Sequence, residues 1–434
     1  MNETGGRNCM EKLMEKILER DNLNKAYLQV YRNKGSQGID GMTVHELKSY
    51  LKVNREVLLQ ELLKETYKPK AVLMVEIPKE DGSKRMLGIP TVVDRVIQQA
   101  INQVLIEIFD TTFSESSYGF RPNRNAHQAI QQAKYYINEG YKYVVDIDLS
   151  KYFDTVNHDR LMYLLTKEIK DSRVLRLIRR FLKGGIIKNG NREETTVGVP
   201  QGSPLSPILA NLYLNEIDKE LENRGHKFCR YADDMQIYVK SKRAGKRVMD
   251  SIAKELEGKM KLKVNEVKSA VRYCTKTKFL GFTFYTKTKS EIVIIPHQKS
   301  RSKFKEKVRE LLKRNKGMNI EVVISRLNLF LIGWVNYYAI SQMKAFIDQM
   351  TSWIRRKIRV YIWKQWKKIK TRHNNLKKLG IDNNKAWEYA NTRKGLWRIS
   401  SSPILQTTLT NDYIGKLGFK SPIKIYSNAH IKFL

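Results

Sequence analysis

Residues 228–239 read FCRYADDMQIYV, with two adjacent carboxylates, Asp233 and Asp234, between two apolar runs. The runs on either side predict two short strands with the aspartates at the turn between them. Neighbouring carboxylates are costly beside apolar strands unless a cation neutralises them, and a turn at a sheet edge would expose them to Mg²⁺. Because an Asp-Asp pair in a turn is usually a solvated cap, this pair needs an acidic partner elsewhere before it indicates chemistry.

A second acidic group lies upstream, where residues 146–154 read DIDLSKYFD at the end of a strand predicted over 141–149. Side chains alternate along a strand, so Asp146 and Asp148 would share one face. Transfer of a nucleotide to a 3′-hydroxyl needs two cations about 3.5–4 Å apart, which carboxylates from neighbouring strands can bridge. We assign Asp148 to metal, and expect Asp146 and Asp154 to have structural roles at a strand end or a helix cap.

The charge of the chain indicates a polyanionic partner. Its 434 residues hold 81 Lys plus Arg against 44 Asp plus Glu, a net charge of +37, and 41% of them are hydrophobic. Such an excess of cations would repel itself in a compact state, and binding to phosphates would release counterions and weaken with salt. A merely soluble basic surface or a ribosome-associated protein is the alternative, but the size of the bias favours nucleic acid.

The cysteines and the apolar stretches indicate a cytosolic protein. Cys9, Cys229 and Cys274 are odd in number and widely spaced, which argues against a disulfide framework and against a structural zinc module. Residues 1–20 show no signal peptide, and the longest apolar stretch, near 330–340, is too short and too polar to span a bilayer. We therefore expect a cytoplasmic location and no membrane partner.

The pattern of elements changes near Pro296, from an α+β front portion to a helical, strongly basic rear portion. In the front we expect helices near the N-terminus, over 93–109 and over 208–214, a hairpin around 72–85, and strands at 141–149, on both sides of the aspartates, at 279–284 and at 291–295. In the rear, apolar residues at helical spacing predict helices over 303–314 and from 320 onward.

The order of these motifs resembles a reverse transcriptase of the type encoded by group II introns, also called maturases. By that resemblance Asp148 and Asp233 would bind both metals, two Mg²⁺ ions or Mn²⁺ as a substitute, and Asp234 would complete the acidic cluster. Phe153 would lie under the sugar and exclude a 2′-hydroxyl, which selects deoxynucleotides, although ordinary core packing also explains a phenylalanine there. The implied fold is a right-hand polymerase with fingers and palm, an antiparallel sheet plus helices, followed by an all-helical thumb.

Residues 198–207, GVPQGSPLSP, are similar to the family's loop against the incoming nucleotide. Gly202 permits close approach of the backbone, and the prolines stiffen the loop before the next helix. The resemblance places Gln201 near the nascent base pair and Gly202 near template and primer.

The resemblance implies five further contacts. Lys79 and Arg85 would neutralise the triphosphate, and Lys268 would donate a proton to pyrophosphate. Arg121 would contact template or nucleotide, and Gly281 would lie in the turn that grips the primer terminus. A solvated basic hairpin, chance in a lysine-rich chain and a plain strand turn are the respective alternatives for the Lys79–Arg85 pair, for Lys268 and for Gly281.

The resemblance covers nearly the whole chain and divides it into four segments. Residues 1–70 correspond to an N-terminal extension, 71–296 to fingers and palm, 297–386 to the thumb or maturase domain, and 387–434 to a basic DNA-binding segment. Residues 351–400 hold 15 Lys plus Arg, two acids and five of the six tryptophans, which suits RNA, although most of these tryptophans would be helix core. The cysteine pairs of the zinc-containing endonuclease found in many maturases are missing, which resembles bacterial class C introns.

The implied activity is copying of intron RNA into cDNA during retrohoming, together with binding of that RNA to assist splicing. The partners would be group II intron RNA, an RNA template with its DNA primer, target DNA and deoxynucleoside triphosphates, and a homodimer is left open. One rival is a retron, diversity-generating or CRISPR-associated reverse transcriptase, which the basic rear portion disfavours. The other is a non-catalytic RNA-binding splicing factor, which the three intact aspartates disfavour.

Overall fold

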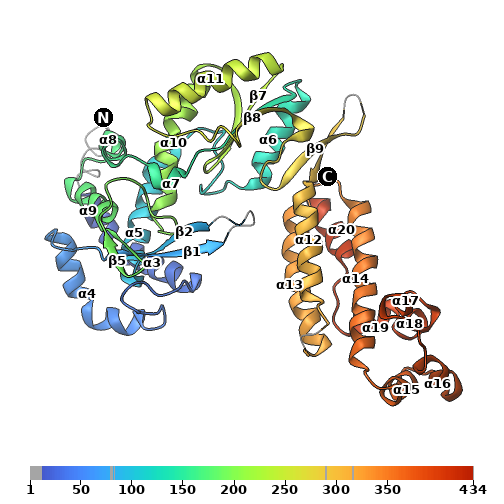
Figure 1. Ribbon diagram of the computed structural model, residues 1–434. Coiled ribbons are helices and arrows are strands. Elements are labelled where there is room, and N and C mark those ends of the chain that lie inside the picture. Colours follow the sequence, from blue (N-terminus) through green and yellow to red (C-terminus); the bar gives the residue numbers. More distant parts are fainter. Residues whose placement is uncertain (1–11, 79–81, 83, 289–290, 315–316, 434) are drawn as a thin grey trace. The chain divides into compact units, whose positions relative to one another are not determined.

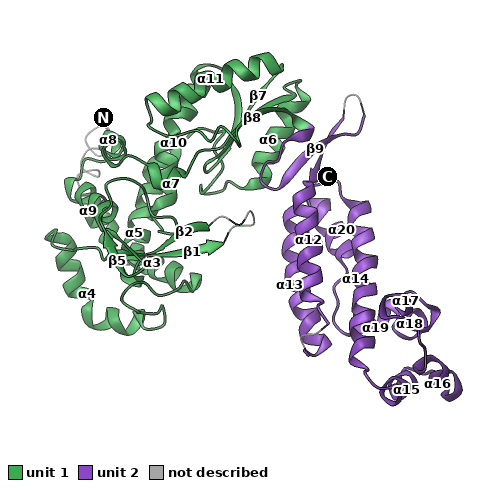
Figure 2. Ribbon diagram, in the orientation of Figure 1, with its two compact units in different colours: residues 1–274 green, residues 275–434 purple. Residues whose placement is uncertain are grey.

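The computed structural model describes residues 12–78, 82, 84–288, 291–314 and 317–433. The chain divides into two compact units, residues 1–274 and 275–434, shown in different colours in Figure 2. Each unit is described by itself below. The predicted α+β front and helical rear are confirmed, and Figure 1 labels the elements.

The first unit alternates helices with short strands. Its helices are α2 (Leu13–Leu18), α3 (Arg20–Asn33), α4 (Leu47–Leu63), α5 (Val92–Phe109), α6 (Ala126–Asn138), α7 (Tyr152–Thr155), α8 (His158–Glu168), α9 (Ser172–Lys183), α10 (Ser206–Asn223) and α11 (Lys242–Gly258), with a 3₁₀ turn at Asp110–Thr112. Its strands are β1 (Val72–Pro78), β2 (Lys84–Ile89), β3 (Tyr143–Ile147), β4 (Ile186–Lys188), β5 (Asn191–Glu193), β6 (Lys227–Tyr231), β7 (Asp234–Val239) and β8 (Ala270–Tyr273).

An antiparallel sheet of order β6-β7-β3-β8 is the platform for both acidic motifs. Val144 and Val145 of β3 are fully buried, because this inner strand is covered on both faces and its β-branched side chains pack on a pleated surface. Helices α6, α10 and α11 contact the sheet. The strands predicted at 141–149 and on both sides of the aspartates are confirmed, as are the helices expected at 93–109 and, in a longer form, at 208–214.

A second sheet, of order β2-β1-β4-β5, carries the predicted hairpin. Strands β1 and β2 pair antiparallel with Ile77 opposite Arg85, and β1 pairs parallel with β4. Residues 79–81 and 83 of the connecting turn lie outside the described part of the chain, and Lys79 is among them.

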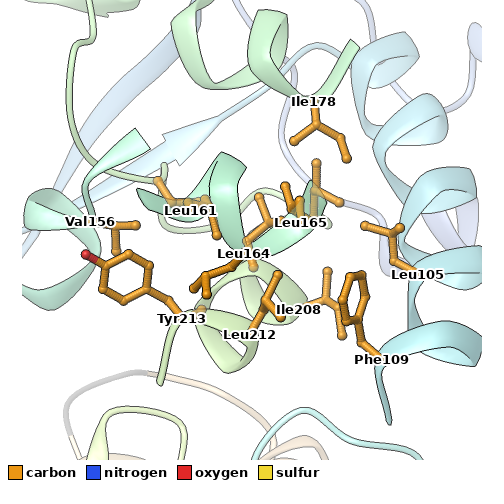
Figure 3. Packing of buried hydrophobic residues seen from close by; sticks show 14 of the residues in the cluster. Leu105, Phe109, Val156, Leu161, Leu164, Leu165, Ile178, Ile208, Leu212 and Tyr213 are labelled. Atoms are coloured by element: carbon orange, nitrogen blue, oxygen red, sulfur yellow. The ribbon is translucent and has the colours of Figure 1, made fainter. Parts of the chain in front are cut away.

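Helices α5, α8, α9 and α10 meet in an apolar core, seen from close by in Figure 3. Leu105, Leu161, Leu165 and Ile178 are fully buried there. Tyr213 is fully buried as well, and its hydroxyl donates a hydrogen bond to the Met260 carbonyl at 2.6 Å, which satisfies the polar end of an otherwise apolar residue. This core holds α10 in place behind the sheet.

The second unit starts with a β-hairpin and continues in helices. Its elements are a 3₁₀ turn whose last residues are Thr275 and Lys276, β9 (Phe282–Thr286), β10 (Ile292–Pro296), α12 (Gln298–Leu311), α13 (Ile320–Tyr338), α14 (Lys344–Gln365), α15 (Ile369–Lys378), α16 (Asn383–Ala390), α17 (Leu396–Ile399), α18 (Pro403–Thr408), α19 (Asn411–Lys416), α20 (Pro422–His430) and a 3₁₀ turn at Ile431–Phe433.

The β9–β10 hairpin belongs to the helical unit, so the compact units divide well before the boundary expected near Pro296. The hairpin pairs with itself and joins neither sheet of the first unit. Its Phe282 ring packs instead on the rings of Tyr337 and Tyr338 at the end of α13, with centroids 5.3 and 4.9 Å away. Aromatic packing of this kind fixes the hairpin to the helices.

Helix α13 has the length and composition of a membrane-spanning helix, the one such helix in the described residues, although the sequence predicted none. A core helix of a soluble protein passes the same test. The stripe Val323, Ile324, Leu327 and Leu331 on this helix is buried and packs into the core of the second unit. The expectation that no membrane is involved stays a prediction.

Candidate active site

The two strands β6 and β7 form a tight hairpin whose turn is Ala232 and Asp233, here named the acidic turn. Tyr231 pairs with Asp234 across the last rung of the ladder. Ala232 has φ +57°, a left-handed conformation that residues with a Cβ adopt only at a cost. Asp233 is exposed and Asp234 is half-buried at the first position of β7. The hairpin therefore presents adjacent carboxylates at one end of the sheet.

Strand register brings Asp148 to the same end of the sheet. Strands β3 and β7 pair antiparallel, with Ile147 opposite Met235. Asp148 directly follows Ile147 and Asp234 directly precedes Met235, so the two acids lie at the same end of these strands. That these acids meet and jointly hold a pair of divalent ions stays a prediction.

The backbone of Asp148 is held from the other side by the segment that leads into β8. Its N–H donates to the Ser269 hydroxyl at 3.0 Å, and its carbonyl accepts from the Asn265 N–H at 2.8 Å. Lys268 lies on this same turn, where its N–H donates to the Asn265 carbonyl at 3.2 Å and its side chain is exposed. Lys268 therefore lies on a segment that is hydrogen-bonded to the backbone of Asp148.

The acidic end of the sheet fits hydrated cations that share ligands with a substrate. Among the residues that the structure describes, no three His, Cys, Asp or Glu side chains gather closely enough to cage a metal ion by themselves. Mg²⁺ in nucleotide-handling proteins commonly takes one or two carboxylates plus substrate phosphates, and Asp148, Asp233 and Asp234 are oxygen donors of that type. These carboxylates would hold the ions only together with a triphosphate.

Asp146 was expected to be a strand-end or helix-capping group, and the structure shows it inside β3 with partners on both neighbouring strands. Its carboxylate accepts from the Arg272 guanidinium at 3.1 Å and from the Gln236 amide at 3.5 Å. Arg272 and Gln236 come from the two strands that flank β3, so the acid ties three strands together. This geometry separates Asp146 from Asp148 in function although both belong to one motif.

The loop 198–203 joins two residues that were predicted to bind nucleotide. The Arg85 Nε donates to the Gln201 Oε1 at 2.6 Å, and the Gln201 carbonyl accepts from the Gly88 N–H at 2.7 Å. Gly202 has φ +106°, and a Cβ placed there would lie 2.7 Å from the Gly88 carbonyl oxygen. The close approach predicted for Gly202 is therefore an approach to β2.

Phe153 is buried in the short helix α7, with 7% of its surface exposed. Its carbonyl accepts from the Val199 N–H at 2.6 Å, and its ring meets the Tyr152 ring edge-on at 5.2 Å. A backbone hydrogen bond thus connects the loop 198–203 to the segment that follows Asp148. Burial fits the packing alternative, and the assignment of Phe153 as a sugar gate stays a prediction.

Arg121 was expected to contact template or nucleotide, and in the structure its guanidinium is hydrogen-bonded within the first unit. The side chain is 4% exposed and forms an ion pair with Asp110 at 2.7 Å. It also donates to the carbonyls of Ser114, Ser117 and Asp110 at 2.6, 3.0 and 2.9 Å. With these intramolecular acceptors the guanidinium fixes the loop 110–117, and its contact with template or nucleotide stays a prediction.

Gly281 lies in the second unit, against the end of α13. A Cβ at this position would lie 2.5 Å from the Tyr338 hydroxyl, and the Gly281 carbonyl accepts from Ser300 Oγ at 2.8 Å. Glycine is therefore required by packing within this unit, and its role at a primer terminus stays a prediction.

Sequence reasoning missed Arg230 and Asp218, which lie directly behind the acidic turn. Both side chains are 0% exposed and form an ion pair at 2.5 Å. Burial raises the pKa of the Asp218 carboxyl, and the adjacent guanidinium opposes that rise. The available signal was an arginine inside a strand with apolar neighbours, since a charge at such a position requires a buried partner.

Comparison with known proteins is consistent with this geometry. Residues 77–284 match the family model described as reverse transcriptase (RNA-dependent DNA polymerase), and residues 301–380 match the maturase-specific domain of group II introns. Protein YkfC of Escherichia coli is 32% identical over 302 residues, which span 60% of this chain and 79% of YkfC. The chain belongs to the group II intron reverse transcriptase/maturase family.

Other members of the reverse transcriptase/maturase family are similar over shorter stretches. The group II intron-encoded protein LtrA of Lactococcus lactis is 34% identical over 267 residues, which span 58% of this chain and 42% of LtrA. A putative COX1/OXI3 intron 2 protein of Saccharomyces cerevisiae is 36% identical over 203 residues, 46% of this chain and 23% of that protein. The chain thus spans less than half of these two relatives.

A solved structure titled a partial Cas6-RT-Cas1–Cas2 complex has a chain 25% identical to this one, with 57% of this chain and 42% of that chain covered. Its TM-score of 0.37 is too low to carry an argument. The maturase-specific match at 301–380 favours the group II intron family over the CRISPR-associated, retron and diversity-generating rivals.

Proposed function

We propose that this reverse transcriptase/maturase copies group II intron RNA into cDNA at Asp148, Asp233 and Asp234 and assists splicing by binding the same RNA. The observation that supports the catalytic part is the register of β3 and β7, in which Ile147 pairs with Met235 and the neighbouring residues at that end of the two strands are Asp148 and Asp234. A fold used only for RNA binding has no need of three carboxylates at one sheet edge.

Two divalent ions, when bound, would lower the pKa of the primer 3′-hydroxyl and stabilise the leaving pyrophosphate. Asp148, Asp233 and Asp234 would hold them through carboxylate oxygens. The 3′-oxygen attacks the α-phosphorus of the deoxynucleotide, a new phosphodiester forms, and the bond to pyrophosphate breaks. Lys268 would supply the proton to pyrophosphate, since its turn is bonded to the Asp148 backbone.

Arg85 and Gln201 would receive the nucleotide as a unit, because their side chains are already hydrogen-bonded at 2.6 Å. A guanidinium that is exposed and fixed by a neighbour can neutralise phosphate charge with little further loss of side-chain freedom. Lys79 would act beside it. Phe153 would limit the space under the sugar and so favour deoxynucleotides.

The second unit would bind the phosphate backbone of the RNA. A cleft of about 630 Å³ is lined by Arg355, Arg356 and Arg359, and Asp412 is the one acid among its lining residues in the part of the chain described. Arg356 is held 3.7 Å over the Trp397 ring and donates to the Trp397 carbonyl at 2.7 Å. Burial and the nearby Arg355 lower the pKa of Arg359. Like charges gathered in this way favour an anionic ligand.

The finer assignments follow the family and are part of the same proposal. The thumb would be residues 297–386 and the DNA-binding segment residues 387–434, with target DNA and a primed RNA template as partners. The chain would act in a bacterial cytoplasm. A homodimer is left open.

The test is primer extension on an RNA template with deoxynucleotides, with and without Mg²⁺, for the unchanged chain, Asp233→Asn and Asp250→Asn. We expect Asp233→Asn to lower kcat by about 10³-fold or more, because a metal ligand is lost. Asp250 is an exposed acid on α11, so Asp250→Asn controls for loss of one negative charge.

RNA binding and splicing are measured on the same proteins. Asp233→Asn should keep both, since neither needs the carboxylate. If the unchanged chain makes no cDNA but still promotes splicing, the non-catalytic splicing factor replaces this proposal. Loss of RNA binding in a folded Asp233→Asn variant would contradict two separable roles.

A further inference from the structure

A fully buried guanidinium supports the acidic turn from behind. Arg230 Nε lies 2.8 Å from Asp218 Oδ1, and its Nη2 lies 2.5 Å from Asp218 Oδ2. The Asp218 carboxylate on α10 thus neutralises the charge of the Arg230 guanidinium on β6. Buried ion pairs add little to stability on average, because the desolvation of both charges offsets their attraction.

The Nη1 of Arg230 is hydrogen-bonded to the acidic turn itself. Nη1 donates to the Ala232 carbonyl at 3.0 Å and to the Asn211 Oδ1 at 3.0 Å. Ala232 has φ +57° and directly precedes Asp233. A left-handed alanine persists only where its surroundings over-determine it, and the guanidinium holds the carbonyl of this residue.

A second segment, which contains Tyr118 and Gly119, also packs against the acidic turn. Asn211 Nδ2 donates to the Gly119 carbonyl at 2.8 Å, and a Cβ at Gly119 would lie 2.3 Å from the Ala232 nitrogen. The Tyr118 N–H donates to the Arg230 carbonyl at 2.8 Å. The backbone of Ala232 is therefore confined between Gly119 and the Arg230 guanidinium.

We propose that Arg230 is a positioning residue, which holds the Ala232 carbonyl so that the carboxylates of Asp233 and Asp234 are pre-set to receive divalent cations. The proposal rests on the nucleotidyl transfer proposed above. Arg230 touches neither substrate nor metal and acts through the backbone of the acidic turn. A displacement of about 1 Å at a reacting centre can cost about 100-fold in rate, so support of this kind matters to turnover.

Two variants separate positioning from stability. Asp218→Leu with Arg230→Met replaces the ion pair by apolar side chains of similar size, an exchange that buried pairs often tolerate without loss of stability. It removes the donor to Ala232. Arg230→Lys keeps a cation beside Asp218, but a single ammonium lacks the planar fork that spans the carboxylate and the carbonyl. At least one of the two should fold.

Arg173→Lys is the matched control. Arg173 pairs with the buried Asp171 at 2.9 Å and also with Glu15, and neither partner belongs to the sheet that carries the aspartates. The variant weakens a partly buried ion pair and should shift the thermal midpoint without touching the acidic turn.

The readouts are kcat per folded molecule, KM for the deoxynucleotide, and the Mg²⁺ concentration at half-maximal rate. For the folded Arg230 variants we expect kcat to fall about 10- to 100-fold and the Mg²⁺ midpoint to rise several-fold, with KM for the nucleotide within about twofold. Arg173→Lys should leave all three unchanged.

Either folded Arg230 variant with an unchanged kcat and Mg²⁺ midpoint overturns the positioning role. The same shift in Arg173→Lys overturns it too, because general destabilisation would then explain the effect. Failure of the proposed function itself gives a different result, since the unchanged chain would then make no cDNA at any Mg²⁺ concentration.

Discussion

Gly202 shows how one residue type is fixed by two separate constraints. Its φ of +106° lies where side chains bring strain, and its missing Cβ leaves room for the Gly88 carbonyl oxygen and the Leu87 side chain. We expect Gly202→Ala to lower the free energy of unfolding by about 2–4 kcal/mol, since backbone strain of about 1–3 kcal/mol and a steric clash add. Chemical denaturation followed by far-ultraviolet circular dichroism measures this loss.

Gly190 provides the matched control for that prediction. It has φ +84° in the turn between β4 and β5, with nothing within 4 Å of an added Cβ. Gly190→Ala should therefore show the conformational cost alone, about 1–2 kcal/mol. Equal losses at the two positions would contradict the steric part of the argument.

His158 makes stability depend on pH. Its Nε2 lies 2.6 Å from the Gly198 carbonyl, so this nitrogen donates, and burial lowers the pKa of the imidazole from its usual 6.5. Above about pH 6.5 the ring is neutral in both the folded and the unfolded chain. Below that value the unfolded chain takes up the proton more readily, so the free energy of unfolding falls as the pH approaches the folded-state pKa.

His158→Gln keeps a donor for Gly198 and removes the titration. The thermal midpoint of the unchanged chain minus that of the variant should become smaller when the pH is lowered from 7.5 to 5.5. The pKa values of His226 and His297 are also lowered by burial, but these residues are common to both proteins and their effects cancel. A difference that stays constant or widens on acidification would contradict the prediction.

Among the elements, helix α13 shows best how the second unit is stabilised. Leu327 is fully buried in that unit's core, whereas Leu329, two positions along the same helix, is 75% exposed. Leu327→Ala should lower the free energy of unfolding by about 2–5 kcal/mol, because it removes buried methyl groups and leaves a cavity. Leu329→Ala should change it by less than about 0.5 kcal/mol.

Tryptophan fluorescence measures this unit selectively. All six tryptophans of the chain lie between residues 334 and 397, within the second unit. A urea transition followed by fluorescence therefore reports on the helices, and unfolding of the first unit should leave it almost unchanged. Similar midpoints for the two leucine variants would show that the α13 stripe does not hold the unit together.

For the whole molecule, the +37 charge makes binding to nucleic acid a salt-dependent property. The logarithm of the binding constant should fall linearly with the logarithm of salt concentration, with a slope of about −0.7 per phosphate contact for single strands. Arg355→Ala with Arg359→Ala should make that slope shallower by about 1–2, since up to two phosphate contacts in the cleft are lost.

Lys259→Ala is the control for charge alone. Lys259 pairs with Glu255 on α11, so its charge is already compensated. The salt titration is done by filter binding with single-stranded RNA and with single-stranded DNA of the same sequence. An unchanged slope for the double arginine variant would remove the cleft from the proposed interface.

Short-range patterns predicted much of the fold and of the candidate site. The strands beside Asp233 and the helix that became α5 follow from side-chain alternation and helical spacing, which are local properties. The family match at 77–284 and 301–380 lies within the stretch where the quoted motifs were found. The ion pair of Arg121 with Asp110 was not predicted, because an arginine that pairs with an acid and one that faces phosphate look alike in sequence.

The sequence by itself determined the chemistry: which carboxylates are available, the excess of positive charge, and the kinds of element that carry them. These follow from residue identity and from periods of two or 3.6 residues. The tertiary structure decided which of these groups meet. The register of β3 against β7 brings Asp148 and Asp234 to one end of the sheet, and the buried Arg230 donates a hydrogen bond to the Ala232 carbonyl. Both arrangements need contacts between segments distant in sequence, β3 with β7 and Arg230 with Asp218 and Asn211 of α10, and residue identity alone does not say which segments pair.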